Sequence, residues 1–130
     1  MNTYTFLILR LAIAVSMFGH GLVRLPKLST FSQWMVGNFD KTMLPKALIL
    51  PFSYVLPIAE FIIGLLLLTG LFTKTAAFSG AVVMLVLLFG TAMIENWDAI
   101  PSQLLHLIFF AILLQFMTNN GYALDNVFFK

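Results

Sequence analysis

Residues 75–94 have the sequence TAAFSGAVVMLVLLFGTAMI, and no charged side chain interrupts this run. As a helix, a stretch of roughly 20 apolar residues crosses the hydrocarbon core of a bilayer. The run therefore predicts a membrane-spanning helix.

The composition of the whole chain agrees with a membrane environment. Hydrophobic residues make up 61% of the 130 residues and charged residues only 9%, which is too little charge to cover the surface of a soluble domain. The mean hydropathy is +1.00. A net charge of +2 without a basic stripe gives no reason to expect nucleic acid as a partner. Because cysteine is absent, disulfides, thiolate metal sites and dithiol exchange by this chain's own residues are excluded.

Three further apolar stretches, residues 4–23, 51–71 and 102–118, reach or approach the length of a span. Only residues 72–74 join the second and third spans, so these helices should be antiparallel neighbours. Pro101, at a first helical turn, and Trp97 just before it are typical of an interfacial entry into the fourth span. We predict an all-α fold: an antiparallel four-helix membrane bundle formed by residues 1–130 as a single domain.

The longer connection, residues 24–50, has an apolar pattern of its own. Phe31, Trp34 and Phe39 recur at near-helical spacing after Ser29, a capping-type residue. This pattern favours a short amphipathic helix in the membrane interface. An irregular loop is the alternative.

An even number of spans places both termini on one side of the membrane. Basic residues favour a cytoplasmic first loop, since that side carries Arg24, Lys27, Lys41 and Lys46, against Lys74 and Lys130 on the terminal side. The first apolar run has no basic region before it and no small-residue cleavage site after it. We therefore expect it to remain as an anchor and not to act as a secretory signal.

Small residues are spaced for close contact between helices. Ala12 with Ser16 and Ala76 with Gly80 form small-xxx-small pairs, and Gly64 lies in the middle of the second span. Ordinary helix packing explains these residues without any ligand.

Glu60 lies near the middle of the second apolar run. A charge near the bilayer centre costs about 2.5–3.5 kcal/mol on insertion scales, so this acid needs a partner or a proton. Arg10 is about 6 Å from the middle of the first span at 1.5 Å per residue, a distance that its side chain covers. We therefore expect a Glu60–Arg10 contact.

Two interpretations of this buried pair stay open. It either only fixes how the first two helices pack, or it belongs to a polar pocket for a quinone head group, a proton or a small substrate. Pro57 favours the pocket, because it frees a backbone carbonyl near Glu60 and can kink the helix.

His20, near the end of the first span, and His106, near the start of the fourth, should share a depth zone on the side of the long loop. Ser16 is one helical turn from His20 and is placed to orient its imidazole. Two histidines on different helices can ligate haem or a metal. Each can equally bond a carbonyl or an interfacial carboxylate, such as Glu95 or Asp98. We expect no metal site and no haem, and quinone is the ligand we consider.

No Gly-rich phosphate loop, H-E-x-x-H motif or nucleophile with a nearby base occurs in the sequence. Catalysis by this chain alone is not expected, and no catalytic residue can be named.

Several short motifs resemble those of one membrane family. They are LRL at residues 9–11, HGLVRL at 20–25, AEFIIG at 59–64, LTGLFTK at 68–74 and NGYALD at 120–125. On these residues the chain resembles the DoxX-like family of small four-helix membrane proteins over nearly its whole length. The family usually has lysine in place of Arg24 and commonly arginine in place of Lys74. Both departures keep the charge, although lysine lacks the planar fork of arginine, and both residues are candidates for contact with an anion or a partner.

The resemblance implies a bacterial inner-membrane protein, with relatives that include a subunit of thiosulfate:quinone oxidoreductase and proteins associated with membrane redox complexes. Combined with the buried charge, it favours a membrane subunit or accessory protein of a redox system that binds quinone or a partner near Arg10, His20, Glu60 and His106. One alternative is an interaction or assembly protein whose polar residues lock helix packing. Another is a small-solute or proton pathway, which would require an oligomer. Besides the lipid bilayer, we expect a protein partner or a second copy of the chain.

Overall fold

The computed structural model describes residues 2–128, so Lys130 lies outside the described residues. The described part is helical and contains four helices that are long and apolar enough to cross a membrane. In chain order the elements are α1 (Thr3–Arg24), η1 (Leu25–Lys27), α2 (Leu28–Asn38), α3 (Lys46–Thr69), α4 (Thr73–Met93), η2 (Trp97–Ala99), α5 (Ile100–Gln115), η3 (Met117–Asn119) and α6 (Asp125–Phe128). The predicted all-α membrane bundle is confirmed.

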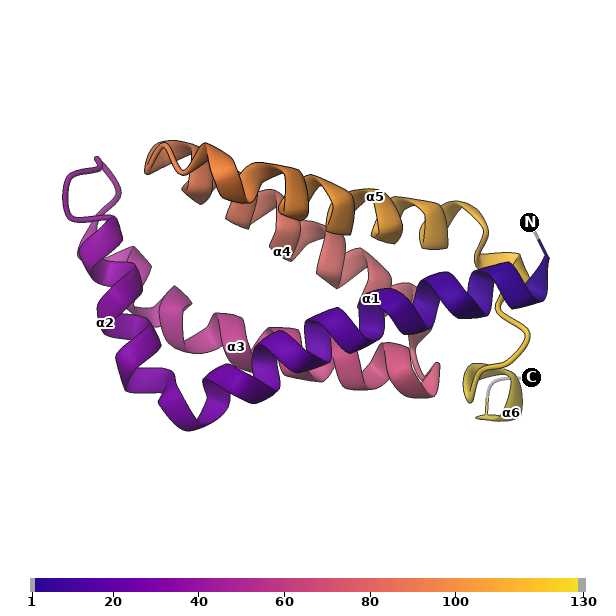
Figure 1. The fold of residues 1–130 in the computed structure, drawn as a ribbon. Coiled ribbons are helices and arrows are strands. Elements are labelled where there is room, and N and C mark those ends of the chain that lie inside the picture. The colour runs from indigo at the N-terminus through magenta and orange to yellow at the C-terminus, as the bar shows by residue number, and fades with distance from the viewer. Residues whose placement is uncertain (1, 129–130) are drawn as a thin grey trace.

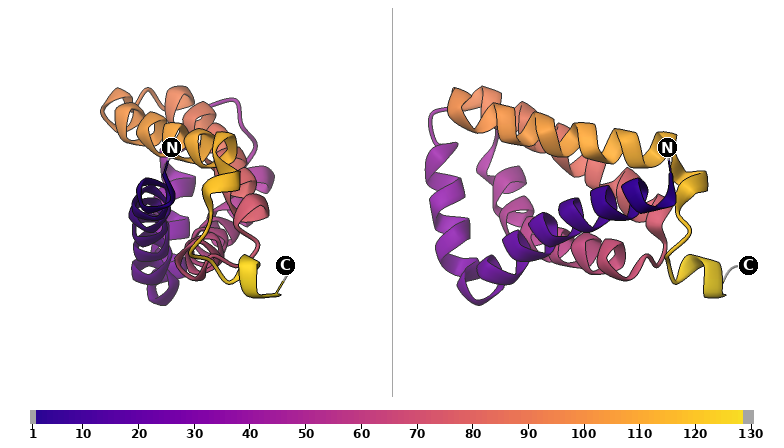
Figure 2. Two further views of the ribbon diagram at one scale, coloured as in Figure 1. Left: turned by 90° about the vertical axis from the view of Figure 1, so that its right-hand side faces the viewer. Right: turned by 45° about the vertical axis from the view of Figure 1, so that its right-hand side comes forward.

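The four long helices form two antiparallel pairs, α1 with α3 and α4 with α5 (Figure 1). The pairs approach each other at the end where both termini lie, and they separate toward the other end, which α2 crosses at a steep angle (Figures 1 and 2). Both termini are therefore at one end of the bundle, as an even number of spans requires. We call the opposite end the α2 end.

A tight turn between α3 and α4 sets the direction of the second pair. Gly70 ends α3 in the left-handed conformation with φ 75°, which glycine adopts without the steric cost of a side chain. At the start of α4, the carboxylate of Asp125 accepts hydrogen bonds from the backbone N–H groups of Phe72 and Thr73, at 2.6 and 2.9 Å. An acid at a helix N-terminus satisfies free N–H groups and complements the helix dipole. The C-terminal segment is thereby attached to this turn.

The closest approach between helices is in the α1–α3 pair. A Cβ atom added to Gly64 would overlap the backbone of Phe18, and one added to Gly21 would overlap the backbone of Phe61. The two helices therefore touch at the backbone, and these two contacts fix their antiparallel register.

The small-residue predictions are confirmed only in part. Gly64 is at the α1–α3 contact, and Gly80 of α4 faces the ring of Phe110 on α5, with Ala76 buried nearby along α4. Ala12, in contrast, is exposed.

The short helix in the first loop is present as α2, so the irregular loop is the wrong alternative. Ser32 of α2 and Ser53 of α3 are both buried, and their hydroxyls are hydrogen-bonded at 2.7 Å. Met35 of α2 also packs with Ile49 and Leu56 of α3. These contacts fix α2 against the first half of α3.

Two of the differences between the observed helix boundaries and the predicted ones matter for the fold. The second long helix begins at Lys46 and not at residue 51, with Pro51 and Pro57 inside it. Proline is tolerated inside membrane helices because neighbouring groups satisfy the backbone carbonyls that it frees. The last long helix ends at Gln115, three residues before the predicted 118, and η3 follows.

Candidate functional site

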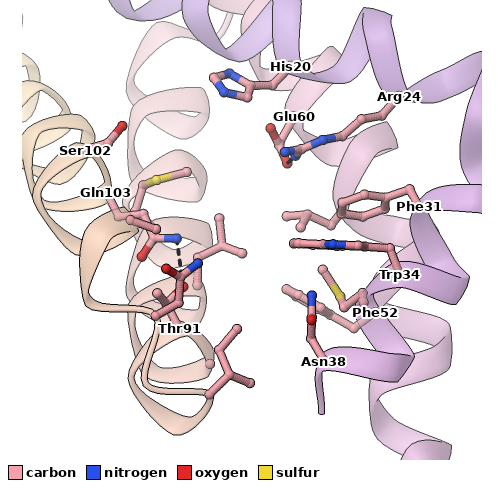
Figure 3. A pocket seen from close by; sticks show the side chains of 18 of the residues that line it. His20, Arg24, Phe31, Trp34, Asn38, Phe52, Glu60, Thr91, Ser102 and Gln103 are labelled. Carbon is pink, nitrogen blue, oxygen red and sulfur yellow. Dashed lines mark hydrogen bonds and ion pairs between the residues drawn. The ribbon is translucent and has the colours of Figure 1, made fainter. Parts of the chain in front are cut away.

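A cavity of about 280 Å³ lies at the α2 end, between the two helix pairs. Every long helix contributes to its lining, and so do α2 and η2. In Figure 3 the side chains of α1, α2 and α3 face those of α4 and α5 across this space. The separation of the two pairs is therefore what creates the cavity.

Glu60 lies at the cavity wall and is paired with Arg24. Nη1 of Arg24 donates to Oε1 of Glu60 at 3.1 Å, and this ion pair joins the end of α1 to the middle of α3. Only 2% of Glu60 is exposed, so its carboxylate is sheltered from lipid. The Arg24 side chain, 34% of which is exposed, lines the cavity as well. A buried acid in a membrane bundle that has a cationic partner of this kind can keep its charge.

Arg24 also begins an aromatic wall on the α2 side. Its guanidinium carbon lies 4.6 Å from the ring centroid of Phe31, within the range of a cation–π interaction. Phe31 in turn stacks on Trp34, with ring centroids 5.9 Å apart and an interplanar angle of 27°. Figure 3 shows these three side chains in succession along one side of the cavity.

His20 of α1 and His106 of α5 lie next to each other at the cavity wall. Their ring centroids are 6.0 Å apart in an edge-to-face arrangement. His20 Nδ1 is 2.6 Å from the backbone carbonyl oxygen of Ser16, and His106 Nε2 is 2.6 Å from the Ser16 hydroxyl. His106 Nδ1 is 2.7 Å from the carbonyl oxygen of Ser102. Since a carbonyl only accepts, Nδ1 carries the proton in both rings.

The predicted shared depth of His20 and His106 is therefore confirmed. Ser16 does position His20, through its backbone carbonyl, while its hydroxyl bonds the other histidine. Haem, a metal, an interfacial carboxylate and a backbone carbonyl were considered as partners of the histidines. Each histidine bonds a backbone carbonyl, that of Ser16 or Ser102. Among residues 2–128, no group of three or more His, Cys, Asp or Glu side chains is close enough to hold a metal ion.

The opposite wall carries an amide with an unused acceptor. Nε2 of Gln103 on α5 donates to Oγ1 of Thr91 on α4 at 2.8 Å. Oε1 of the same amide is buried and has no hydrogen-bond partner among the described residues. Both side chains line the cavity (Figure 3).

The expected contact between Glu60 and Arg10 is wrong. Arg10 is buried at the terminal end, where Nη1 donates to Oδ1 of Asn120 at 2.8 Å and lies beside Gly70. The reason is the register of α1 and α3, which places Glu60 level with the last turn of α1 and Arg10 level with the end of α3. The prediction compared the distances of Glu60 and Arg10 from the middle of their own spans, and it did not include the shift of α1 along α3.

The DoxX family model matches residues 5–93. This chain belongs to the DoxX family. Together with its four long apolar helices, the family makes it a multi-pass membrane protein in contact with the lipid bilayer. No match was found in a comparison with curated proteins or in one with solved structures.

The match covers most of α1 and all of α2, α3 and α4, and so includes His20, Arg24 and Glu60 of the cavity lining. Helix α5, which carries His106 and Gln103, lies beyond the matched residues. Of the site residues predicted from the sequence, four line the cavity: His20, Arg24, Glu60 and His106. Arg10 and the exposed Lys74, in the first turn of α4, lie outside it, toward the end of the bundle where the termini are.

Other lining residues were not predicted as site residues. Phe31 and Trp34 were expected only to face the apolar side of an interfacial helix, and Thr91 and Gln103 were not considered. A signal was present in the sequence, since Thr91 and Gln103 are polar residues near adjoining ends of two apolar spans, and Arg24 follows His20 by one helical turn.

Proposed function

We propose that this protein is a membrane subunit or accessory protein of a bacterial redox system, located in the inner membrane, and that it binds the head group of a quinone in the cavity at the α2 end. The observation that carries the proposal is the composition of this cavity. Apolar and aromatic side chains form most of its lining, and a few polar groups converge on it, which is the usual character of a small-molecule site.

The chemistry of a quinone matches this lining. Its flat ring can be buried against Phe31, Trp34 and Leu56, while its two oxygens require hydrogen-bonding groups at opposite edges of the ring. Polar groups are present on both walls: Arg24 and Glu60 on one, and Gln103 on the other. An isoprenoid tail would extend from the ring into the surrounding lipid.

The lack of cysteine in the sequence favours a role in binding the quinone and not in supplying electrons to it. The chain has no thiol that could exchange electrons with a quinone. Electrons would therefore come from a cofactor in a partner subunit, and this protein would bind and orient the quinone.

The direct test is a titration of the purified protein in lipid nanodiscs with ubiquinone and menaquinone analogues. We expect saturable binding of at least one analogue, weakened by Glu60→Gln. Lys74→Gln, at the opposite end of the bundle, is the matched control and should leave the affinity unchanged. The absence of saturable binding by either analogue, with or without Glu60→Gln, would defeat the proposal.

A second candidate is a non-catalytic assembly protein whose polar residues lock the helices together. It is favoured by two polar contacts of the α2 end that join different helices: Arg24–Glu60 joins α1 to α3, and Ser16–His106 joins α1 to α5. Buried polar pairs of this kind can specify helix register. Co-purification with neighbouring proteins in mild detergent, followed by a visible absorption scan for haem or flavin, distinguishes a redox partner from a colourless one.

The third candidate, a small-solute or proton pathway, stays a prediction from the sequence. Unchanged flux in liposomes that contain the protein would remove it.

A further inference from the structure

The aromatic wall of the cavity is a stack of three flat groups, Arg24, Phe31 and Trp34, all of which line the cavity (Figure 3). The guanidinium carbon of Arg24 lies 4.6 Å from the ring centroid of Phe31. Phe31 lies against Trp34, with ring centroids 5.9 Å apart and an interplanar angle of 27°. Trp34 is therefore the last member of the stack, at the end away from the ion pair.

The aromatic wall is fixed by contacts with α3. Its guanidinium, on Arg24, bonds the buried carboxylate of Glu60 at 3.1 Å. Its two rings belong to α2, which the buried Ser32–Ser53 hydrogen bond, at 2.7 Å, attaches to α3. A wall that is already ordered costs a ligand little conformational entropy on binding.

The indole of Trp34 has a face that Phe31 does not cover. Among residues 2–128, Phe31 is the only aromatic ring that stacks on it. Trp34 lines the cavity and is still 58% exposed. Trp97, near the same end of the bundle, is similarly exposed at 62% but does not line the cavity. Trp34 is thus the exposed tryptophan that a ligand in the cavity can reach.

Indole is an electron-rich ring, and its face is the negative part of its quadrupole. The ring of a quinone is electron-poor, because two carbonyl groups withdraw electron density, whereas the hydroxyl groups of a quinol donate electron density to the ring. Resting on the function proposed above, we infer that the quinone ring stacks on the uncovered face of Trp34, as the next member of the aromatic wall, and that this contact favours the oxidised form. Trp34 is thus a specificity-determining residue.

The experiment compares the affinities of a short-chain ubiquinone and the corresponding ubiquinol for the protein in nanodiscs, under anaerobic conditions. We expect the quinone to bind about fivefold more tightly, the effect of one favourable aromatic pair. Trp34→Leu should remove this preference by weakening quinone binding more than quinol binding. Trp97→Leu is the matched control, since Trp97 is an exposed tryptophan outside the cavity lining, and it should preserve the preference.

The visible absorption spectrum provides a readout that is specific for stacking. An electron-poor ring that lies on an indole gives a charge-transfer band that neither group has alone. We expect this band when quinone binds to the unmodified protein or to Trp97→Leu, and we expect its loss in Trp34→Leu. Trp34→Phe should keep part of the preference and move the band to shorter wavelength, because a phenyl ring gives up electron density less readily than indole.

The outcomes separate this inference from the proposed function. Equal affinity for both redox forms in the unmodified protein, an unchanged quinone affinity in Trp34→Leu, or an equal loss for both forms in that variant overturns the stacking and leaves the quinone site standing. Quinone binding without a charge-transfer band has the same meaning. Failure of both redox forms to bind overturns the proposed function, and the stacking with it.

Discussion

Arg24, the last residue of α1, and Glu60, in the middle of α3, are joined at 3.1 Å although 36 positions separate them in the sequence. The pair is possible because α1 and α3 touch at the backbone through Gly21 and Gly64, which sets the acid level with the end of its neighbour. An acid at this depth is tolerated in a membrane helix because it faces the bundle and has a cationic partner. Both members of the pair line the cavity, and Arg24 begins its aromatic wall.

The two members of the pair should respond unequally to substitution. Arg24→Gln leaves Glu60 buried without a cation, and we expect a loss of about 3 kcal/mol in the free energy of unfolding. Glu60→Gln leaves an arginine that is one-third exposed and still has an amide acceptor, so we expect a loss nearer about 1 kcal/mol. Unfolding in mixed micelles with a denaturing detergent measures both values.

The double substitution tests whether the contact is real. Arg24→Gln with Glu60→Gln should cost less than the sum of the two single changes. The control cycle pairs Glu60→Gln with Arg10→Gln, and there the costs should add, because Arg10 bonds Asn120 at the other end. Additive costs in the first cycle would argue against the Arg24–Glu60 contact.

The glycines of α1 and α3 provide a test of the close packing. Alanine normally favours a helix over glycine by about 1 kcal/mol. At Gly64, however, the added methyl group would overlap the backbone of Phe18, so Gly64→Ala should destabilise the protein by about 1–3 kcal/mol, as overpacking does. Gly19→Ala is the control, because no atom lies within 4 Å of its added Cβ, and it should be neutral or slightly stabilising. A stabilising Gly64→Ala would mean that the two helices are farther apart.

Loss of the Arg10 contact should destabilise the terminal end without affecting the cavity. Asn120→Ala removes the oxygen that accepts from the buried guanidinium, and we expect a loss of about 1–3 kcal/mol. Quinone affinity should stay within twofold of the unmodified protein, a range of about 0.4 kcal/mol. A large loss of affinity without a loss of stability would place the ligand at the terminal end instead.

The two tryptophans allow the position of the ligand to be followed by fluorescence. Quinones quench indole emission at short range, and Trp34 lines the cavity whereas Trp97 does not. Trp34→Phe should therefore abolish the saturable part of the quenching, and Trp97→Phe should retain it. The reverse result would place the ligand outside the cavity.

The long helices of this protein were predictable because a helix that crosses the bilayer needs about 20 consecutive apolar residues. Apolar length alone located the four long helices, and the spacing of Phe31, Trp34 and Phe39 located α2. The start of α3 was missed because Pro51 resembles a helix start, whereas in this fold the helix extends back to Lys46 and includes the proline.

The site was predicted incompletely because its geometry depends on how the helices pair. His20 and His106 could be placed at one level from topology alone. The partner of Glu60 could not, since Arg10 and Arg24 both lie on α1 and only the contacts of Gly21 and Gly64 decide between them. The cavity itself arises from the separation of the helix pairs, a tertiary feature with no local pattern. Gln103 and Thr91 face each other only because α4 and α5 are antiparallel neighbours.

The most direct test of the central claim is photolabelling of the protein in nanodiscs with a quinone analogue that carries a photoreactive group on its ring. Peptide mass spectrometry should find saturable label on α2 around Phe31 and Trp34 and on α5 around Gln103, with labelling suppressed by excess unlabelled quinone. Label spread over the lipid-facing surfaces of all four long helices, without suppression by the competitor, would contradict a quinone site at the α2 end.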